Sequence, residues 1–211
     1  CGPIATTVAD VALIDGVIAA DHTPLTVLSL KGVRLGLPTT TFQENLSPAV
    51  GARLDEVIEC LEEEGVVFVR EDVPDLATLV EETSLITLGG AFRGDMEAYL
   101  RERNTGVSFE ALADQIANSF VRGWIEPYLS PTADIIKSYE TTKTTAMPKL
   151  KQAFESYLKK HRLDAILFPT SPVTAGIELN IDGDMIIDGE TIPNGVWLNI
   201  QNTGPASLWG G

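Results

Sequence analysis

An α/β fold, with a mixed and partly parallel sheet covered by helices, is the fold class that the sequence predicts. Short β-branched segments alternate with longer amphipathic segments along the chain, a pattern typical of α/β domains. One strand, helix and strand fit within about 35 residues, the length of a right-handed parallel crossover. The 211 residues, 44% of them hydrophobic, are enough for one sizeable core.

The parallel crossover is predicted between residues 33 and 69. The apolar run from Val33 to Leu37 ends at a proline, as a short inner strand does. Ser47 is a favourable N-cap and Gly65 a favourable C-terminal residue, so together they bracket a helix over Pro48 to Glu64. Val66 to Val69 follows at once as the next strand.

A helical region is predicted next, and it leads into a third strand. Helices are expected over Asp75 to Leu88, Ala91 to Arg103 and Ser108 to Arg122, because glycines separate these stretches. The buried stripe of the third helix is expected to consist of Phe109, Leu112, Ile116 and Phe120. Prolines should then break the pattern at Pro127 and Pro131 and interrupt a later long helix at Pro148. The third strand is Ala165 to Phe168.

Two further elements flank this core. Thr7 and Asp10 have the form of a capping box, and the following helix from Val8 to Ile18 is apolar on most faces, so we expect it to be buried. Near the other end, Ile177 to Ile181 and Met185 to Ile187 flank an Asp-Gly-Asp turn. That composition predicts a hairpin outside the parallel sheet.

The domain organisation expected is one domain over residues 1–211, incomplete at both ends. The chain begins with Cys1 and reaches an apolar helix within a few residues, and it ends in a glycine-rich apolar run. Three core strands are few for this much helical surface. We therefore expect the amino-terminal portion of the same protein to be the partner that completes the fold.

Charge and cysteine content exclude several classes of function. The net charge of −15 repels phosphate backbones and anionic lipid, so neither nucleic acid nor a membrane is an expected partner. Cys1, Cys60, His22 and His161 are scattered and show no metal-ligand spacing. We expect no metal and no cofactor, and a cytoplasmic location.

The candidate binding residues follow the third strand. Thr170 and Ser171 stand between two prolines at its carboxyl end, where ligand clefts of open α/β sheets lie. One interpretation makes Ser171 a nucleophile that acts with His161 and Asp164. The G-x-S-x-G motif that presents such a serine on a sharp strand-to-helix turn is, however, absent from the sequence. The favoured interpretation is that Thr170 and Ser171 line a binding pocket. The alternative is that they only form a turn and satisfy local backbone groups.

Four segments, in order, resemble the amidase signature family. They are residues 2–13 (GPIATTVADVAL), 30–38 (LKGVRLGLP), 61–69 (LEEEGVVFV) and 164–172 (DAILFPTSP). The resemblance covers almost the whole chain and places it in the downstream portion of the family. Residues 202–207 (NTGPAS) are similar to the mandelamide and indoleacetamide hydrolase branch.

The resemblance implies an amide hydrolase acting on a small-molecule amide. Members of the family use a Ser, cis-Ser, Lys triad, which belongs upstream of Gly2 and Pro3, so no catalytic residue is expected in this chain. The chain would supply scaffold and walls of the acyl pocket, including Thr170, Ser171 and Thr203. The alternatives are a catalytically dead binding or scaffold protein of the same fold and an amidotransferase subunit.

Overall fold

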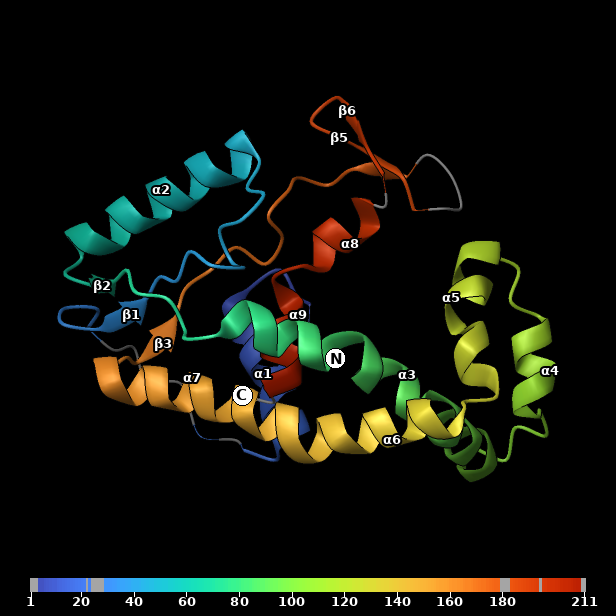
Figure 1. Ribbon diagram of the computed structural model, residues 1–211. Coiled ribbons are helices and arrows are strands. Elements are labelled where there is room, and N and C mark those ends of the chain that lie inside the picture. Colours follow the sequence, from blue (N-terminus) through green and yellow to red (C-terminus); the bar gives the residue numbers. More distant parts are fainter. Residues whose placement is uncertain (1–3, 22, 24–28, 179–182, 194, 210–211) are drawn as a thin grey trace.

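A three-stranded parallel sheet lies between helices on its two faces, at one side of the molecule (Figure 1). The computed structural model describes residues 4–21, 23, 29–178, 183–193 and 195–209. The helices are α1 (Val8–Ala19), α2 (Pro48–Glu63), α3 (Leu76–Glu102), α4 (Phe109–Asp114), α5 (Ser119–Leu129), α6 (Ala133–Thr141), α7 (Met147–His161), α8 (Gly195–Ile200) and α9 (Thr203–Trp209), with a π-helical segment η1 (Thr142–Ala146) between α6 and α7. The strands are β1 (Arg34–Gly36), β2 (Val67–Val69), β3 (Ala165–Ile166), β4 (Ile177–Glu178), β5 (Met185–Ile187) and β6 (Glu190–Ile192).

The three strands predicted to share a sheet do so, in the order β2-β1-β3. Both pairings are parallel, with Leu35 opposite Phe68 on one side and opposite Ala165 on the other. The expected parallel crossover and fold class are therefore confirmed. The strands are shorter than the apolar runs that predicted them, since β1 ends at Gly36 and β3 at Ile166, before Pro38 and Pro169.

Helix α2 covers one face of this sheet. Ser47 caps it as predicted, since its Oγ accepts a hydrogen bond from the Val50 amide over 3.4 Å. Leu54 and Ile58 are buried on its inner side and pack with Phe68 and Leu167. Because α2 begins at the predicted Pro48 and ends at Glu63, one residue before the predicted end, this crossover is the part of the fold most directly specified by local signals.

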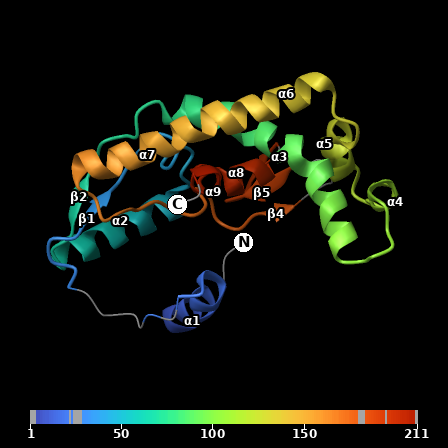
Figure 2. The same cartoon turned by 90° about the horizontal axis from the view of Figure 1, so that it is seen from below.

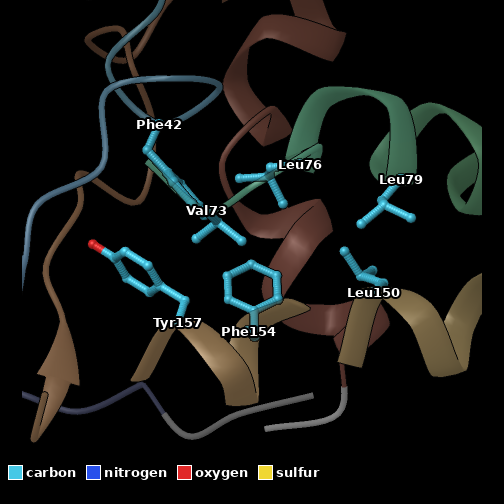
Figure 3. Packing of buried hydrophobic residues seen from close by; sticks show 7 residues of the cluster. All are labelled: Phe42, Val73, Leu76, Leu79, Leu150, Phe154 and Tyr157. Carbon is cyan, nitrogen blue, oxygen red and sulfur yellow. The ribbon is translucent and has the colours of Figure 1, made fainter. Parts of the chain in front are cut away.

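Helix α7 covers the opposite face and contributes to the main core (Figures 1 and 3). Phe168 packs on this side while the adjacent Leu167 packs towards α2, as the alternation of side chains along an extended segment requires. The Tyr157 hydroxyl donates to the Glu71 carbonyl over 2.8 Å. Burial, and then the negative charges of Asp72 and Glu71, raise the pKa of Tyr157 to about 12. The cluster comprises Phe42, Val73, Leu76, Leu79, Leu150, Phe154 and Tyr157.

Helix α3 corrects one prediction, because it runs through the two glycines that were expected to divide it. A side chain at Gly89 would meet the Tyr128 ring at 2.0 Å, and one at Gly90 would meet the Cβ of Tyr139 at 2.2 Å. These glycines therefore allow α5 and α6 to approach closely. Tertiary packing outweighs the low helix propensity of glycine at these two positions.

The segment from Ser108 to Arg122 forms two helices rather than the single one predicted. Asn118 starts the second helix, since its side chain accepts a hydrogen bond from the Val121 amide over 3.0 Å. Pro127 does not break the pattern as expected but lies in the last turn of α5. Of the predicted stripe, Phe109 is buried, whereas Leu112 is exposed and Ile116 lies between the two helices.

The predicted interruption at Pro148 is not a break, because the helix continues from α6 through η1 into α7. The long helix contains the π-helical segment η1 immediately before α7, and Pro148 stands in the first turn of α7. Proline has no amide hydrogen to donate to the preceding turn. The wider π turn is the local adjustment that accompanies the missing donor.

Helix α1 forms as predicted, with Thr7 accepting from the Asp10 amide over 3.1 Å, but the expectation of burial is wrong. Val8, Leu13 and Val17 are respectively 79%, 68% and 67% exposed. Figure 2 shows α1 beside the remainder of the chain rather than within it. An apolar helix needs covering surface from another element, and the described residues do not provide it.

The predicted hairpin is confirmed as a separate antiparallel sheet, in the order β4-β5-β6. Ile177 pairs with Ile186 and Glu178 with Met185. Part of the expected turn, together with Ile181, lies outside the described residues. No helix within the described part of the chain combines the length and the apolar character needed to cross a membrane.

Candidate functional site

The loops that follow β1, β2 and β3 meet at one edge of the parallel sheet. Parallel strands end at the same edge, which is where ligands bind in open α/β folds. The loops span residues 37–46, 70–75 and 167–172. Gln201 and Asn202, which directly precede α9, donate hydrogen bonds to the loops after β1 and β3, so a fourth chain segment reaches this edge.

Asp72 joins the loop after β2 to the loop after β1. Its Oδ1 accepts hydrogen bonds from the Thr39 and Thr40 amides over 2.6 and 2.9 Å, and its Oδ2 accepts from the Thr40 hydroxyl over 2.8 Å. Burial raises the pKa of Asp72, but the hydrogen bonds from Thr40 and Thr39 outweigh this effect and leave the pKa below its ordinary value of 3.8. The ionised carboxylate therefore stabilises both loops.

The loop after β3 carries Thr170 and Ser171. The Ser171 hydroxyl donates to the Val173 carbonyl over 3.1 Å and accepts from the Val173 amide over 3.3 Å. The Ser171 hydroxyl thus satisfies local backbone groups of a turn, which is the predicted alternative to pocket lining. Thr170 is exposed at the edge of the sheet. The Pro172 carbonyl accepts from the Ser47 amide over 2.9 Å and so ties this loop to the start of α2.

Thr203 begins α9, and the structure brings it towards Thr170. Its hydroxyl donates to the Ile200 carbonyl over 2.9 Å. The residue before Thr203 is bonded to the residue before Thr170, because the Asn202 side-chain amide donates to the Pro169 carbonyl over 2.8 Å. Two of the predicted binding residues therefore flank one tertiary hydrogen bond.

Asn202 and Gln201 lie at this edge of the sheet and were not identified from the sequence. Asn202 is fully buried, and Gln201 reaches the carbonyl of Thr41 over 2.7 Å. Their partners lie 33 and 160 residues away in the sequence. The local signal in the sequence is a pair of amide side chains directly before the Thr-Gly-Pro segment. Two adjacent residues form no periodic pattern, so sequence analysis could not predict what they contact.

The structure separates the three residues considered for a Ser, His, Asp set. Asp164 Oδ2 accepts from the Arg34 amide over 2.8 Å, and His161 Nε2 lies 3.5 Å from Glu71. Both residues lie before β3, whereas Ser171 follows it and bonds to Val173. A nucleophile and its base must be within hydrogen-bond reach, and these three groups have different partners.

An apolar cavity of about 250 Å³ lies between β3, α7 and α9. Phe42 and Phe168 stack beside it, with ring centroids 4.3 Å apart. Among the residues that the structure describes, β3 pairs on one side only, so the cavity adjoins an open strand edge. Within the same residues no group of three or more His, Cys, Asp or Glu side chains could hold a metal ion. The lining includes Phe42, Phe154, Leu158, Ile166, Phe168 and Ala206.

The loops after the three parallel strands and the residues before α9 are thus held together by hydrogen bonds at one edge of the sheet. In the comparison with known families, the family model described as Amidase matches residues 1–209. The chain belongs to the Amidase family. The resemblance that the sequence carries in its four segments is thereby confirmed.

Curated relatives in this family include named hydrolases. An indoleacetamide hydrolase of Agrobacterium vitis is 32% identical over 206 residues, which are 98% of this chain and 44% of the relative. A mandelamide hydrolase of Pseudomonas putida is 32% identical over 180 residues, 81% of this chain and 35% of the relative. This Amidase chain thus spans less than half the length of the curated relatives it matches.

Solved structures agree on the fold. A crystal structure of an amidase superposes with a TM-score of 0.65 at 20% identity, covering 99% of this chain and 43% of the other. The peptide amidase of Stenotrophomonas maltophilia gives a TM-score of 0.57 at 18% identity, covering 99% and 44% respectively. The segments compared therefore have the Amidase fold.

Proposed function

We propose that the longer protein containing this chain is an amide hydrolase, which converts a carboxylic amide and water into a carboxylic acid and ammonia or an amine. The observation that carries the proposal is the 32% identity to an indoleacetamide hydrolase across 98% of this chain. The net charge of −15 supports a small-molecule substrate over nucleic acid.

The chemistry is proposed to lie outside this chain. Acyl transfer needs an activated nucleophile and oxyanion donors. The Ser, cis-Ser, Lys triad implied by the resemblance would precede Gly2. The different hydrogen-bond partners of Ser171, His161 and Asp164 support this assignment, because none of the three activates another.

This chain is proposed to contribute walls of the acyl pocket, with Thr170, Ser171 and Thr203 on its lining. The convergence of the loops after β1 and β3 with the start of α9 supports that role. Pocket walls decide which acyl group fits, whereas the nucleophile and the oxyanion donors decide the rate of the chemical step. Selectivity and chemistry are thereby divided between two portions of one protein.

The amino-terminal portion of the same protein is the proposed partner of two surfaces. One is the apolar surface of α1, on which Val8 and Leu13 are largely exposed. The other is the open edge of β3 with its adjoining apolar cavity. Covering both would bury apolar groups and satisfy strand-edge backbone groups, two changes that stabilise a folded protein.

A role as one component of an amidotransferase is the second candidate. A subunit of the glutamyl-tRNA(Gln) amidotransferase of Pelobacter propionicus is 25% identical over 98% of this chain and 47% of the relative. Over matches that span 98% of this chain, the identity is 32% to an indoleacetamide hydrolase and 25% to this subunit, and for that reason hydrolysis is the first proposal. A catalytically dead binding or scaffold protein of the same fold is the remaining alternative.

The test is an assay of the purified full-length protein with an aromatic primary amide, measuring acid and ammonia. Equimolar release of both without any other polypeptide supports the hydrolase. Activity that appears only with a co-purifying polypeptide, and with glutamine as the amide, supports the amidotransferase. Binding of the amide with release of neither product supports the scaffold.

A further inference from the structure

One buried carboxamide connects three segments at the carboxyl edge of the sheet. The Asn202 side chain has no exposed surface, and its Nδ2 donates to the carbonyls of Phe42 and Pro169, each over 2.8 Å. The two hydrogens of one planar amide point in fixed directions. Asn202 therefore fixes the distance and the angle between the loop after β1 and the loop after β3.

The adjacent carboxamide holds the loop after β1 at further points. Gln201 Nε2 donates to the Thr41 carbonyl over 2.7 Å and to the Glu44 carbonyl over 3.1 Å. Its Oε1 accepts from the Asn45 side-chain amide over 2.9 Å. Asn202 Oδ1 is a third acceptor, 3.3 Å from Gln201 Nε2, so one of the two amide hydrogens is shared between two acceptors. The two adjacent side chains together are called the amide clamp.

The loop held by the amide clamp contains unfavourable backbone. Thr41 has φ of +72° and Asn45 has φ of +59°. Left-handed backbone is costly for a β-branched residue, and a folded protein keeps it only where surrounding contacts determine it. The contacts of Gln201 with Thr41 and Asn45 fall on these two residues.

We propose that Gln201 and Asn202 are positioning residues that set the selectivity of the acyl pocket by holding the loops after β1 and β3 against α9. The inference rests on the proposed function and adds to it two residues that touch no reacting atom. Their amides act through Thr170 and Thr203, which flank the bond between Asn202 and Pro169. If the loops separate, the pocket changes its width while the chemical groups keep their places.

The test substitutes each amide by the acid of the same shape in the full-length protein. Asn202→Asp replaces Nδ2, which donates both hydrogen bonds, with a carboxylate oxygen that faces the same two carbonyls. Oxygen atoms that face each other without a hydrogen between them repel. Gln201→Glu makes the same change at a partly exposed position and serves where Asn202→Asp fails to fold. Asn199→Asp is the matched control, because its amide donates to Met185 Sδ on β5 and not to either loop.

Two measurements decide the outcome. Amide hydrogen exchange in residues 38–46 and 169–172 should become faster in both clamp variants and stay unchanged in the control and in α7. The KM for an aromatic primary amide should rise about tenfold while kcat, and the KM for a short aliphatic amide, change by less than about threefold. A purely structural defect would instead lower the melting temperature and reduce the amount of active protein for every substrate equally.

The proposal is overturned if folded clamp variants keep the exchange pattern of the unsubstituted protein, or keep its ranking of aromatic and aliphatic amides. If the unsubstituted full-length protein hydrolyses no amide at all, the proposed function fails. The exchange measurement then judges the positioning role by itself, so the two failures are distinguishable.

Discussion

Gly36 on β1 and Tyr157 on α7 fit so closely that a methyl group at position 36 would lie 2.7 Å from the tyrosine hydroxyl. The same methyl would lie 2.9 Å from the Leu163 side chain. The Tyr157 hydroxyl is held by the Glu71 carbonyl and has little freedom to move. The absence of a side chain at Gly36 therefore allows α7 to lie directly on the sheet.

Substitution Gly36→Ala should lower the free energy of unfolding by about 1–3 kcal/mol, the usual cost of overpacking a core. Chemical denaturation of the protein measures the change. Gly51→Ala in α2 is the control, because a side chain there meets nothing within 4 Å and alanine is the better helix former. Equal stability of the Gly36→Ala and unsubstituted proteins would show that the close approach is not required.

A second prediction concerns the glycines inside α3. Gly89→Ala should destabilise the protein, because the new methyl group overlaps the Tyr128 ring. The cost should shrink when the ring is removed by Tyr128→Ala, and a double-mutant cycle measures that coupling. Gly94→Ala in the same helix has open space around it and serves as the control. Additive effects of the two substitutions would contradict the contact.

Acid should weaken the link between the loops after β1 and β2. The folded state holds the pKa of Asp72 below 3.8, so the carboxylate stabilises the protein above that pH and loses its effect as the pH falls through the folded value. Asp72→Asn should therefore be less stable than the unsubstituted protein at neutral pH, and the difference should narrow in acid. Unfolding measured across the pH range tests this, with the exposed Asp55→Asn on α2 as the charge control. A difference that stays constant with pH would refute the role of the ionised carboxylate.

Where local signals coincide, the sequence predicts the fold well. The N-cap at Ser47, the proline after it and Gly65 mark α2 within one residue of its observed end. The continuous path of α3 could not be predicted, because it depends on Tyr128 and Tyr139, which approach from other helices. The exposure of α1 could not be predicted either. The spacing of apolar residues identifies the apolar face of a helix but not the surface that covers it.

The candidate site divides in the same way. Thr170 and Ser171 were predictable because a strand ending in prolines places them at the carboxyl edge of a parallel sheet. Asn202 was not predictable, because its importance comes from hydrogen bonds to Phe42 and Pro169, which are distant in the sequence. Long-range bonds of this kind leave no pattern along the chain.

Selectivity should respond to the two threonines of the proposed pocket. Thr170→Val and Thr203→Val replace a hydroxyl by a methyl group of similar volume. In the full-length protein, each should change the ratio of kcat/KM between aromatic and short aliphatic amides by about tenfold, more than it slows the best substrate. Steady-state kinetics on both amide classes provide the measurement. An equal loss on every substrate, as removal of an oxyanion donor causes, would contradict pocket lining.

The central claim is that this chain shapes the pocket while the nucleophile lies elsewhere in the protein, and Ser171→Ala in the full-length protein tests it most directly. Because the Ser171 hydroxyl bonds only to the backbone of Val173 among the contacts described for it, kcat for an aromatic primary amide should stay within about tenfold of the unsubstituted value. Loss of kcat by a factor of about 10⁶, as removal of a catalytic serine produces, would contradict the account and identify Ser171 as the nucleophile.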